Sequence, residues 1–183
     1  MTTQQVPVVT GEISAESLIQ PLTLRKILVA IDQSPTAESV FAQALSLATL
    51  YHGKLKILSC IPSSSPSLAM APGDLLGAEI YGIDTGVAVA IAEQQMRKSL
   101  DDLQLWLQQY GEVASHQGIP TEFDYLCGEP GPSICEAAQT WGADMVVVGR
   151  RGRRGLSEIL LGSVSNYVLH HAPCSVLTVQ GGH

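Results

Sequence analysis

The chain has 183 residues, of which 45% are hydrophobic, and a formal net charge of -7 at pH 7. This length and apolar content predict one domain with a substantial core, while the negative charge argues against nucleic acid and anionic membranes as partners. No apolar run reaches the roughly 18 to 20 residues that span a bilayer, and the N-terminus lacks the basic start and apolar segment of a secretory signal. We therefore expect a cytoplasmic protein.

The N-terminal third of the sequence predicts an extension followed by a βαβ unit. Residues 1–22 show no regular period, and we expect a flexible extension ahead of one domain over residues 23–183. An aliphatic run at 26–31 is typical of a strand that is buried on both faces of a parallel sheet. Ser34 stands where a helix N-cap is expected, and regularly spaced apolar residues then predict a helix. A second apolar run at 55–61 completes the unit.

The middle of the chain predicts a loop, two helices and a strand. Residues 62–86 are rich in Ser, Pro and Gly, and we expect a long mobile loop of the kind that often carries function. A stripe of apolar residues predicts a long helix over 87–118, although Gly111 weakens its last turns. The alternating stretch 121–127 predicts a strand near the sheet edge, and a further helix is expected over 132–140.

The C-terminal part continues the alternation of strands and helices. Residues 144–149 predict a buried strand, 163–170 a helix and 174–179 the last strand. The order of these elements predicts an α/β fold with a single doubly wound, five-stranded parallel sheet and helices on both faces, similar to a Rossmann fold.

A loop that is rich in glycine and arginine follows the strand at 144–149. Ligands of open parallel sheets bind outside the carboxyl ends of the strands, where the strand order reverses. Gly149 and Gly152 allow positive φ, so that successive N–H groups can point at phosphate oxygens. Gly162 and Ser163 offer the same at the start of the next helix, where free N–H groups and the helix dipole favour negative charge. These features predict a phosphate-binding loop.

The glycines of this loop follow the spacing GxxG, nine residues and then GS, at Gly149, Gly152, Gly162 and Ser163. The spacing resembles the nucleotide-binding signature of the universal stress protein family, in its ATP-binding branch. The segment RKILVAIDQSPTAESVFAQALSLA resembles the first strand and helix of that family, and APCSVLTV resembles its last strand. The resemblance covers roughly residues 24–180 and implies a fold like that of the adenine nucleotide alpha hydrolases.

The resemblance also implies a ligand, which is ATP or another adenine nucleotide, with Mg²⁺ accompanying ATP. The phosphates would lie over Gly149–Gly152 and Gly162–Val164, where Arg151 would contribute its backbone at least as much as its guanidinium. Asp32 would face the ribose or the phosphate-bound metal, and Ser34 is a further expected contact. The base would lie against residues at the strand ends, namely Ala30, Ile31, Cys60 and Val148.

Several of these residues also have simpler interpretations. The cluster Arg150–Arg154 is also compatible with a solvated turn or a nucleic-acid patch. Asp32 is compatible with a residue that stabilises the dipole of the following helix, and Ser163 with an ordinary N-cap. Cys60 is better interpreted as a pocket-lining or core thiol than as a redox centre, because it has no basic neighbour in the sequence.

The sequence favours regulation by a bound nucleotide over catalysis. The pattern GxxxxGK[ST] is absent, and Asp32 is the only obvious carboxylate near the expected phosphates. We therefore expect no catalytic residues and at most weak ATP hydrolysis. A slow ATPase or nucleotide hydrolase, a sensor of AMP or cyclic AMP, and a nucleic-acid binder are the alternatives.

The expected protein partners follow from the last strand. The resemblance implies a homodimer through residues 174–179, and an apolar strand edge without a partner gives a physical reason for such pairing. The sequence is also compatible with larger oligomers and with a regulatory partner protein that it does not identify.

Overall fold

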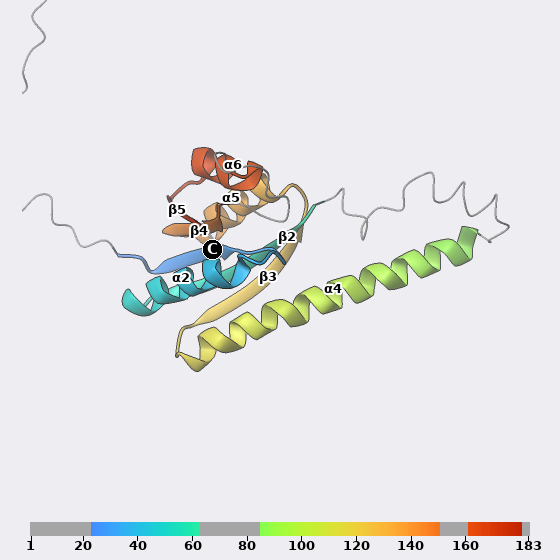
Figure 1. Cartoon of the computed structure of the whole chain (residues 1–183), viewed down its shortest axis with the longest axis horizontal. Coiled ribbons are helices and arrows are strands. Elements are labelled where there is room, and N and C mark those ends of the chain that lie inside the picture. Colours follow the sequence, from blue (N-terminus) through green and yellow to red (C-terminus); the bar gives the residue numbers. More distant parts are fainter. Residues whose placement is uncertain (1–22, 63–84, 151–160, 181–183) are drawn as a thin grey trace, which may run out of the picture.

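The structure is a computed structural model that describes residues 23–62, 85–150 and 161–180. Its strands form one five-stranded sheet in the order β3-β2-β1-β4-β5, and every neighbouring pair is parallel (Figure 1). The elements in chain order are β1 (Lys26–Ala30), α2 (Ala37–Leu50), β2 (Lys54–Ile61), α4 (Thr85–His116), β3 (Thr121–Cys127), α5 (Pro130–Trp141), β4 (Met145–Gly149), α6 (Ser163–His171) and β5 (Ser175–Val179). The predicted doubly wound α/β fold is confirmed.

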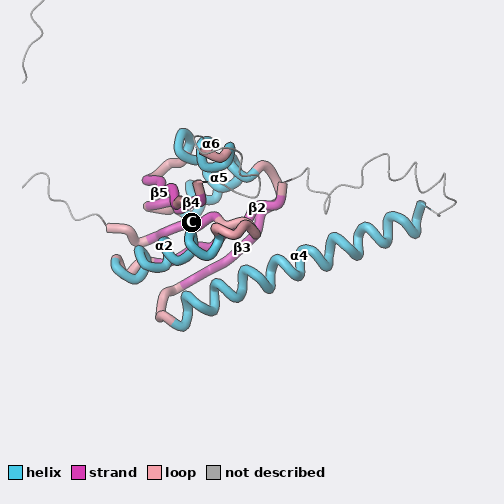
Figure 2. The backbone as a smooth tube through the Cα atoms, in the orientation of Figure 1, coloured by secondary structure: helices cyan, strands magenta, loops and turns pink. Residues whose placement is uncertain are grey.

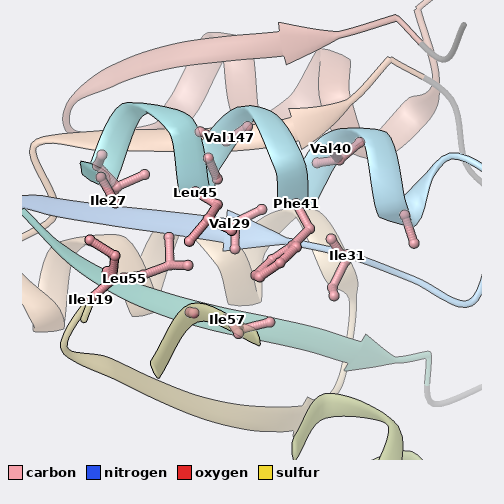
Figure 3. Packing of buried hydrophobic residues seen from close by; sticks show 14 of the residues in the cluster. Ile27, Val29, Ile31, Val40, Phe41, Leu45, Leu55, Ile57, Ile119 and Val147 are labelled. Carbon is pink, nitrogen blue, oxygen red and sulfur yellow. The ribbon is translucent and has the colours of Figure 1, made fainter. Parts of the chain in front are cut away.

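The helices cover both faces of the sheet because successive strand residues point to opposite faces. Ile27 and Val29 of β1 belong to the core cluster beneath α2 and α4, whereas Leu28 belongs to the cluster beneath α5 and α6. Figure 3 shows the first cluster, in which Phe41 and Leu45 of α2 lie against the sheet. Each central strand thus needs apolar residues on both faces, which explains the unbroken aliphatic runs in the sequence.

The sheet edges agree with the sequence analysis. The predicted strand 121–127 forms β3 with the same bounds and lies at one edge, next to β2. The last strand, β5, lies at the other edge. None of the described helices has the length and apolar character needed to cross a membrane.

Several helix boundaries differ from the expected ones. Helix α2 begins at Ala37 with Thr36 as its N-cap, so the prediction of Ser34 as N-cap is wrong. Ser34 instead belongs to the preceding turn, where its carbonyl oxygen accepts a hydrogen bond of 3.1 Å from the Ala37 N–H. Helix α5 starts at Pro130, two residues earlier than expected, and α4 spans Thr85–His116.

Helix α4 continues through Gly111 because that glycine makes close packing possible. A Cβ atom at Gly111 would lie 2.9 Å from Cδ1 of Phe123 on β3. The absence of a side chain therefore lets the helix approach the edge strand, and this contact compensates for the low helix propensity of glycine. The expected extension 1–22, and all of the expected loop 62–86 apart from its end residues, lie outside the described ranges.

Candidate functional site

The strand order reverses between β1 and β4, and we call the space outside the carboxyl ends of these two strands the crevice. These strands are neighbours, with Ala30 opposite Val148, yet β1 continues to α2 on one face and β4 continues to α6 on the other. The two connections therefore diverge at the carboxyl end of the sheet. Such a switch point is where open α/β sheets bind ligands.

One wall of the crevice is the turn after β1. The Ile31 N–H donates to the Leu58 carbonyl oxygen at 2.9 Å, which holds the end of β1 against β2. The Asp32 carboxylate accepts a hydrogen bond of 3.3 Å from the Ser34 N–H. Asp32 precedes α2 by several residues, and the acidic residue in the first turn of that helix is Glu38. The geometry thus gives little support to Asp32 as a partner of the helix dipole.

The other wall begins at the end of β4. Gly149 is opposite Val179 of β5, and the next residue, Arg150, donates its N–H to the Val179 carbonyl oxygen at 2.7 Å. The φ of Gly149 is not positive, because this glycine is the last residue of β4 and pairs with β5 in an extended conformation. Gly162 is also extended, with φ of -62°. The expectation of positive φ is therefore wrong at both glycines, although each still brings a bare backbone to this end of the sheet.

Helix α6 presents its N-terminus beside this exit. Gly162 is the N-cap, and its carbonyl oxygen accepts the Asn166 N–H at 2.9 Å. The N–H groups of Ser163, Val164 and Ser165 precede that bond and have no acceptor within the helix. The interpretation of Ser163 as an N-cap is wrong, because it is the first residue of the helix and is exposed. Together with the helix dipole, these N–H groups favour an anion at this end.

A buried serine joins the two ends of the loop between β4 and α6. The Gly162 N–H donates to the Arg150 carbonyl oxygen at 2.8 Å. The Ser165 hydroxyl, which is 2% exposed, lies 2.9 Å from the same oxygen and 3.0 Å from the Gly162 carbonyl oxygen. We call these contacts of Arg150, Gly162 and Ser165 the loop clasp. The sequence analysis did not find Ser165, although a serine three residues after an N-cap is a signal for a bond back to the N-cap carbonyl.

The residues expected around the base do not all share one face. Ala30, Cys60 and Val148 belong to the α5 and α6 side, but Ile31 is buried on the other side, next to Phe41 (Figure 3). Val148 and Ile31 are both buried, whereas Ala30 and Cys60 are partly exposed.

The environment of Cys60 agrees with a lining thiol. Burial raises the pKa of the Cys60 thiol to about 12, with a smaller contribution from the neighbouring Cys127. The thiol therefore stays protonated at neutral pH, and a thiolate nucleophile is not available there.

Two of the expected contacts, Arg151 and Gly152, lie outside the described residues, as do Arg153 and Arg154. Within the described ranges, no group of three or more His, Cys, Asp or Glu side chains could hold a metal ion.

Comparisons with known proteins agree with the fold. The chain matches the model of the universal stress protein family over residues 23–180. Universal stress protein Sll1388 of Synechocystis is 41% identical over 155 residues, which make up 85% of this chain and 97% of that protein.

Two solved structures share the fold at low sequence identity. A universal stress protein in complex with cAMP has a TM-score of 0.56 and 22% identity, covering 87% of this chain and 99% of the other. A universal stress protein family member from Arabidopsis thaliana with AMP bound has a TM-score of 0.55 and 20% identity, covering 86% of this chain and 92% of the other.

Proposed function

Because the chain belongs to the universal stress protein family, we propose that it binds an adenine nucleotide in the crevice between β1 and β4 and acts as a nucleotide-responsive regulator. The observation that carries this proposal is the N-terminus of α6 beside the exit of β4, held there by the loop clasp. The folds with bound cAMP and AMP support an adenine nucleotide as the ligand class.

The proposed pose follows from the chemistry of the two walls. The phosphates lie at the first turn of α6, where the N–H groups of Ser163 and Val164 act as donors. Asp32 faces the ribose or a phosphate-bound Mg²⁺, and the base lies toward Ala30 and Cys60 at the ends of β1 and β2. With ATP, the Mg²⁺ would neutralise phosphate charge beside Asp32.

Regulation rather than catalysis is the role that this set of groups supports. Phosphoryl transfer needs a positioned water or base and cationic groups on the transferred phosphate. Among the described residues at the crevice, Asp32 is the one carboxylate, and it already accepts the Ser34 N–H. Binding energy alone does not lower a reaction barrier, but it can stabilise one conformation over another.

Calorimetric titration tests the proposal directly. Nucleotide-free protein is titrated with magnesium ATP, AMP and cyclic AMP, and we expect measurable binding whose order of affinity identifies the state that is sensed. Gly162→Val should abolish binding, because it places a side chain at the N-cap beside the phosphate donors. Ser46→Val, at an exposed position of α2, is the control.

Two results would overturn parts of this proposal. The absence of binding for all three nucleotides would contradict a nucleotide site. Phosphate release from ATP well above background, lost in Asp32→Ala, would instead identify an ATPase.

We also propose that two copies pair through β5, since this strand lies at the sheet edge and is only partly buried apart from Val179. Unpaired backbone groups on an edge strand favour pairing with another strand. Sedimentation velocity should show a dimer that Thr178→Lys weakens, because a lysine on an edge strand opposes pairing. A monomer for the unmodified protein would contradict this interface.

A further inference from the structure

Helix α4 is much longer than the sheet that it covers. Its 32 residues correspond to about 48 Å of helix, whereas the seven residues of β3 correspond to about 23 Å of strand. Figures 1 and 2 show that the N-terminal half of α4 runs away from all other labelled elements. We call residues 85–100 of this helix the arm.

The arm does not take part in the core. The buried residues of α4 are Leu103, Leu107, Gly111 and Ala114, all of them C-terminal to the arm. Within the arm, Val87 is 53% exposed, Val89 is 38% exposed and Ile91 is 50% exposed. These three belong to the run VAVAIA, which is apolar around the whole helix.

A helical arm with this sequence needs a partner. The arm continues the packed half of α4 and needs no separate nucleation, but tertiary packing does not stabilise it and its β-branched residues lower its helix propensity. Clustered exposed apolar side chains are also unfavourable in water and commonly mark an interaction site. Contacts with another molecule would offset both costs.

The charges of the arm indicate which partner fits. Glu93, Arg97 and Asp101 follow one another at intervals of four residues, so they lie on one stripe of the helix. A two-fold axis near Gln95 that relates two antiparallel arms places Glu93 of each copy opposite Arg97 of the other. The same register places the small Ala90 opposite the bulky Leu100 of the second copy.

We propose that the arm pairs with the arm of a second copy of this chain as an antiparallel two-helix contact. Such a contact is isologous, so each salt bridge and each apolar contact occurs twice. The uncharged tip at 87–92 then covers the partner's helix where that helix meets its own core, near Leu103. A negatively charged membrane would attract Arg97 and Lys98 but repel Glu93, whereas a second arm pairs Glu93 with Arg97.

The arm contact is separate from the β5 edge. Helix α4 packs on β3 and β2, whereas β5 lies at the opposite end of the strand order. The contact therefore does not depend on the proposed nucleotide site or on pairing through β5. Where both contacts form, they build an assembly larger than a dimer.

A charge-reversal experiment isolates the contact between copies. In Glu93→Arg, residues 93 and 97 are both basic. In Arg97→Glu, residues 93 and 97 are both acidic. Each variant alone should associate about tenfold more weakly in sedimentation velocity, because two attractive pairs become repulsive. An equimolar mixture should regain association, and native mass spectrometry should show dimers that contain one copy of each variant.

The mixture distinguishes a contact between two copies from an effect within a single helix. Glu93 and Arg97 are also four residues apart on one helix, a spacing at which opposite charges attract, and both variants lose that attraction, but mixing cannot restore it. Glu112→Arg, a charge reversal on the packed half of α4, is the matched control and should leave association unchanged. Val89→Glu, on the same stripe as Glu93 and Arg97, should weaken association in the same way as the single charge reversals.

Three outcomes would overturn the proposal. The first is that neither charge reversal changes the association of the protein. The second is that the mixture of the two variants associates no better than each variant alone. The third is that the arm of the unmodified protein binds phosphatidylglycerol vesicles instead of a second copy. Thr178→Lys in each background separates arm pairing from pairing through β5, because only the latter should respond to it.

Discussion

The loop clasp makes a sharp prediction for Ser165→Ala. The Ser165 hydroxyl has one hydrogen, which it shares between the carbonyl oxygens of Arg150 and Gly162. After the substitution, neither oxygen loses its last donor, because Arg150 keeps the Gly162 N–H and Gly162 keeps the Asn166 N–H. The change therefore removes one hydrogen bond without leaving a buried group unsatisfied.

The size of the effect follows from this count. Loss of one net hydrogen bond should lower the free energy of unfolding by about 1 kcal/mol, which corresponds to about 2 to 4 °C in Tm for a chain of this length. If the clasp positions the first turn of α6, a loss of about 1 kcal/mol in nucleotide binding corresponds to about fivefold in Kd.

The assay combines thermal unfolding with calorimetric titration of AMP. Ser46→Ala is the matched control, since the Ser46 hydroxyl also donates to a backbone carbonyl oxygen, at 2.8 Å from that of Ala42, but on an exposed part of α2. We expect the control to keep its affinity. An unchanged AMP affinity in Ser165→Ala would refute a positioning role for the clasp, and a fall in both variants would point to a general loss of stability.

Three further predictions concern packing and thiol chemistry. Gly131→Ala should destabilise the fold by about 1 to 3 kcal/mol in urea unfolding, since its Cβ would lie 2.8 Å from the Tyr167 ring; an unchanged midpoint would contradict this packing of α5 on α6. Leu107→Ala should cost about 2 to 5 kcal/mol in the same assay, because this side chain of α4 is fully buried in the core cluster with Leu55 and Ile57, and a cost below about 1 kcal/mol would refute that burial. Iodoacetamide at pH 8 should modify the exposed Cys127 well before Cys60, whose raised pKa leaves about one thiolate in 10,000; equal rates in peptide mass spectrometry would contradict the pKa.

The fold could be predicted because its main determinants are local. Strands β1 and β4 have apolar residues on both faces, and only a central parallel strand requires that pattern. The edge position of β3 followed from its alternating polar residues. Helix starts were less predictable, because Ser34 and Thr36 can both act as caps. The structure has Thr36 at the N-cap, without a hydrogen bond from its side chain to the helix.

The length of the arm shows a different limit of sequence patterns. The stripe through Met96 and Leu100 continues without interruption into Leu103 and Leu107, so a single amphipathic helix was expected. The pattern shows that one face of the helix is apolar but does not show what covers it. Only the length of the sheet reveals that the first half of this face extends beyond the fold.

The candidate site shows how a predicted chemistry can rest on a different geometry. The glycines were expected to act through positive φ, yet Gly149 continues a strand and Gly162 is an extended N-cap. In the proposed pose a phosphate approaches the backbone at the first turn of α6, beside both glycines, and this pose does not depend on positive φ. The clasp could not be found in this way, because the Arg150 carbonyl oxygen approaches Ser165 only after β4 and α6 have packed on the sheet. What holds the donors in place is therefore a tertiary contact, and its contribution to binding is what the Ser165→Ala titration measures.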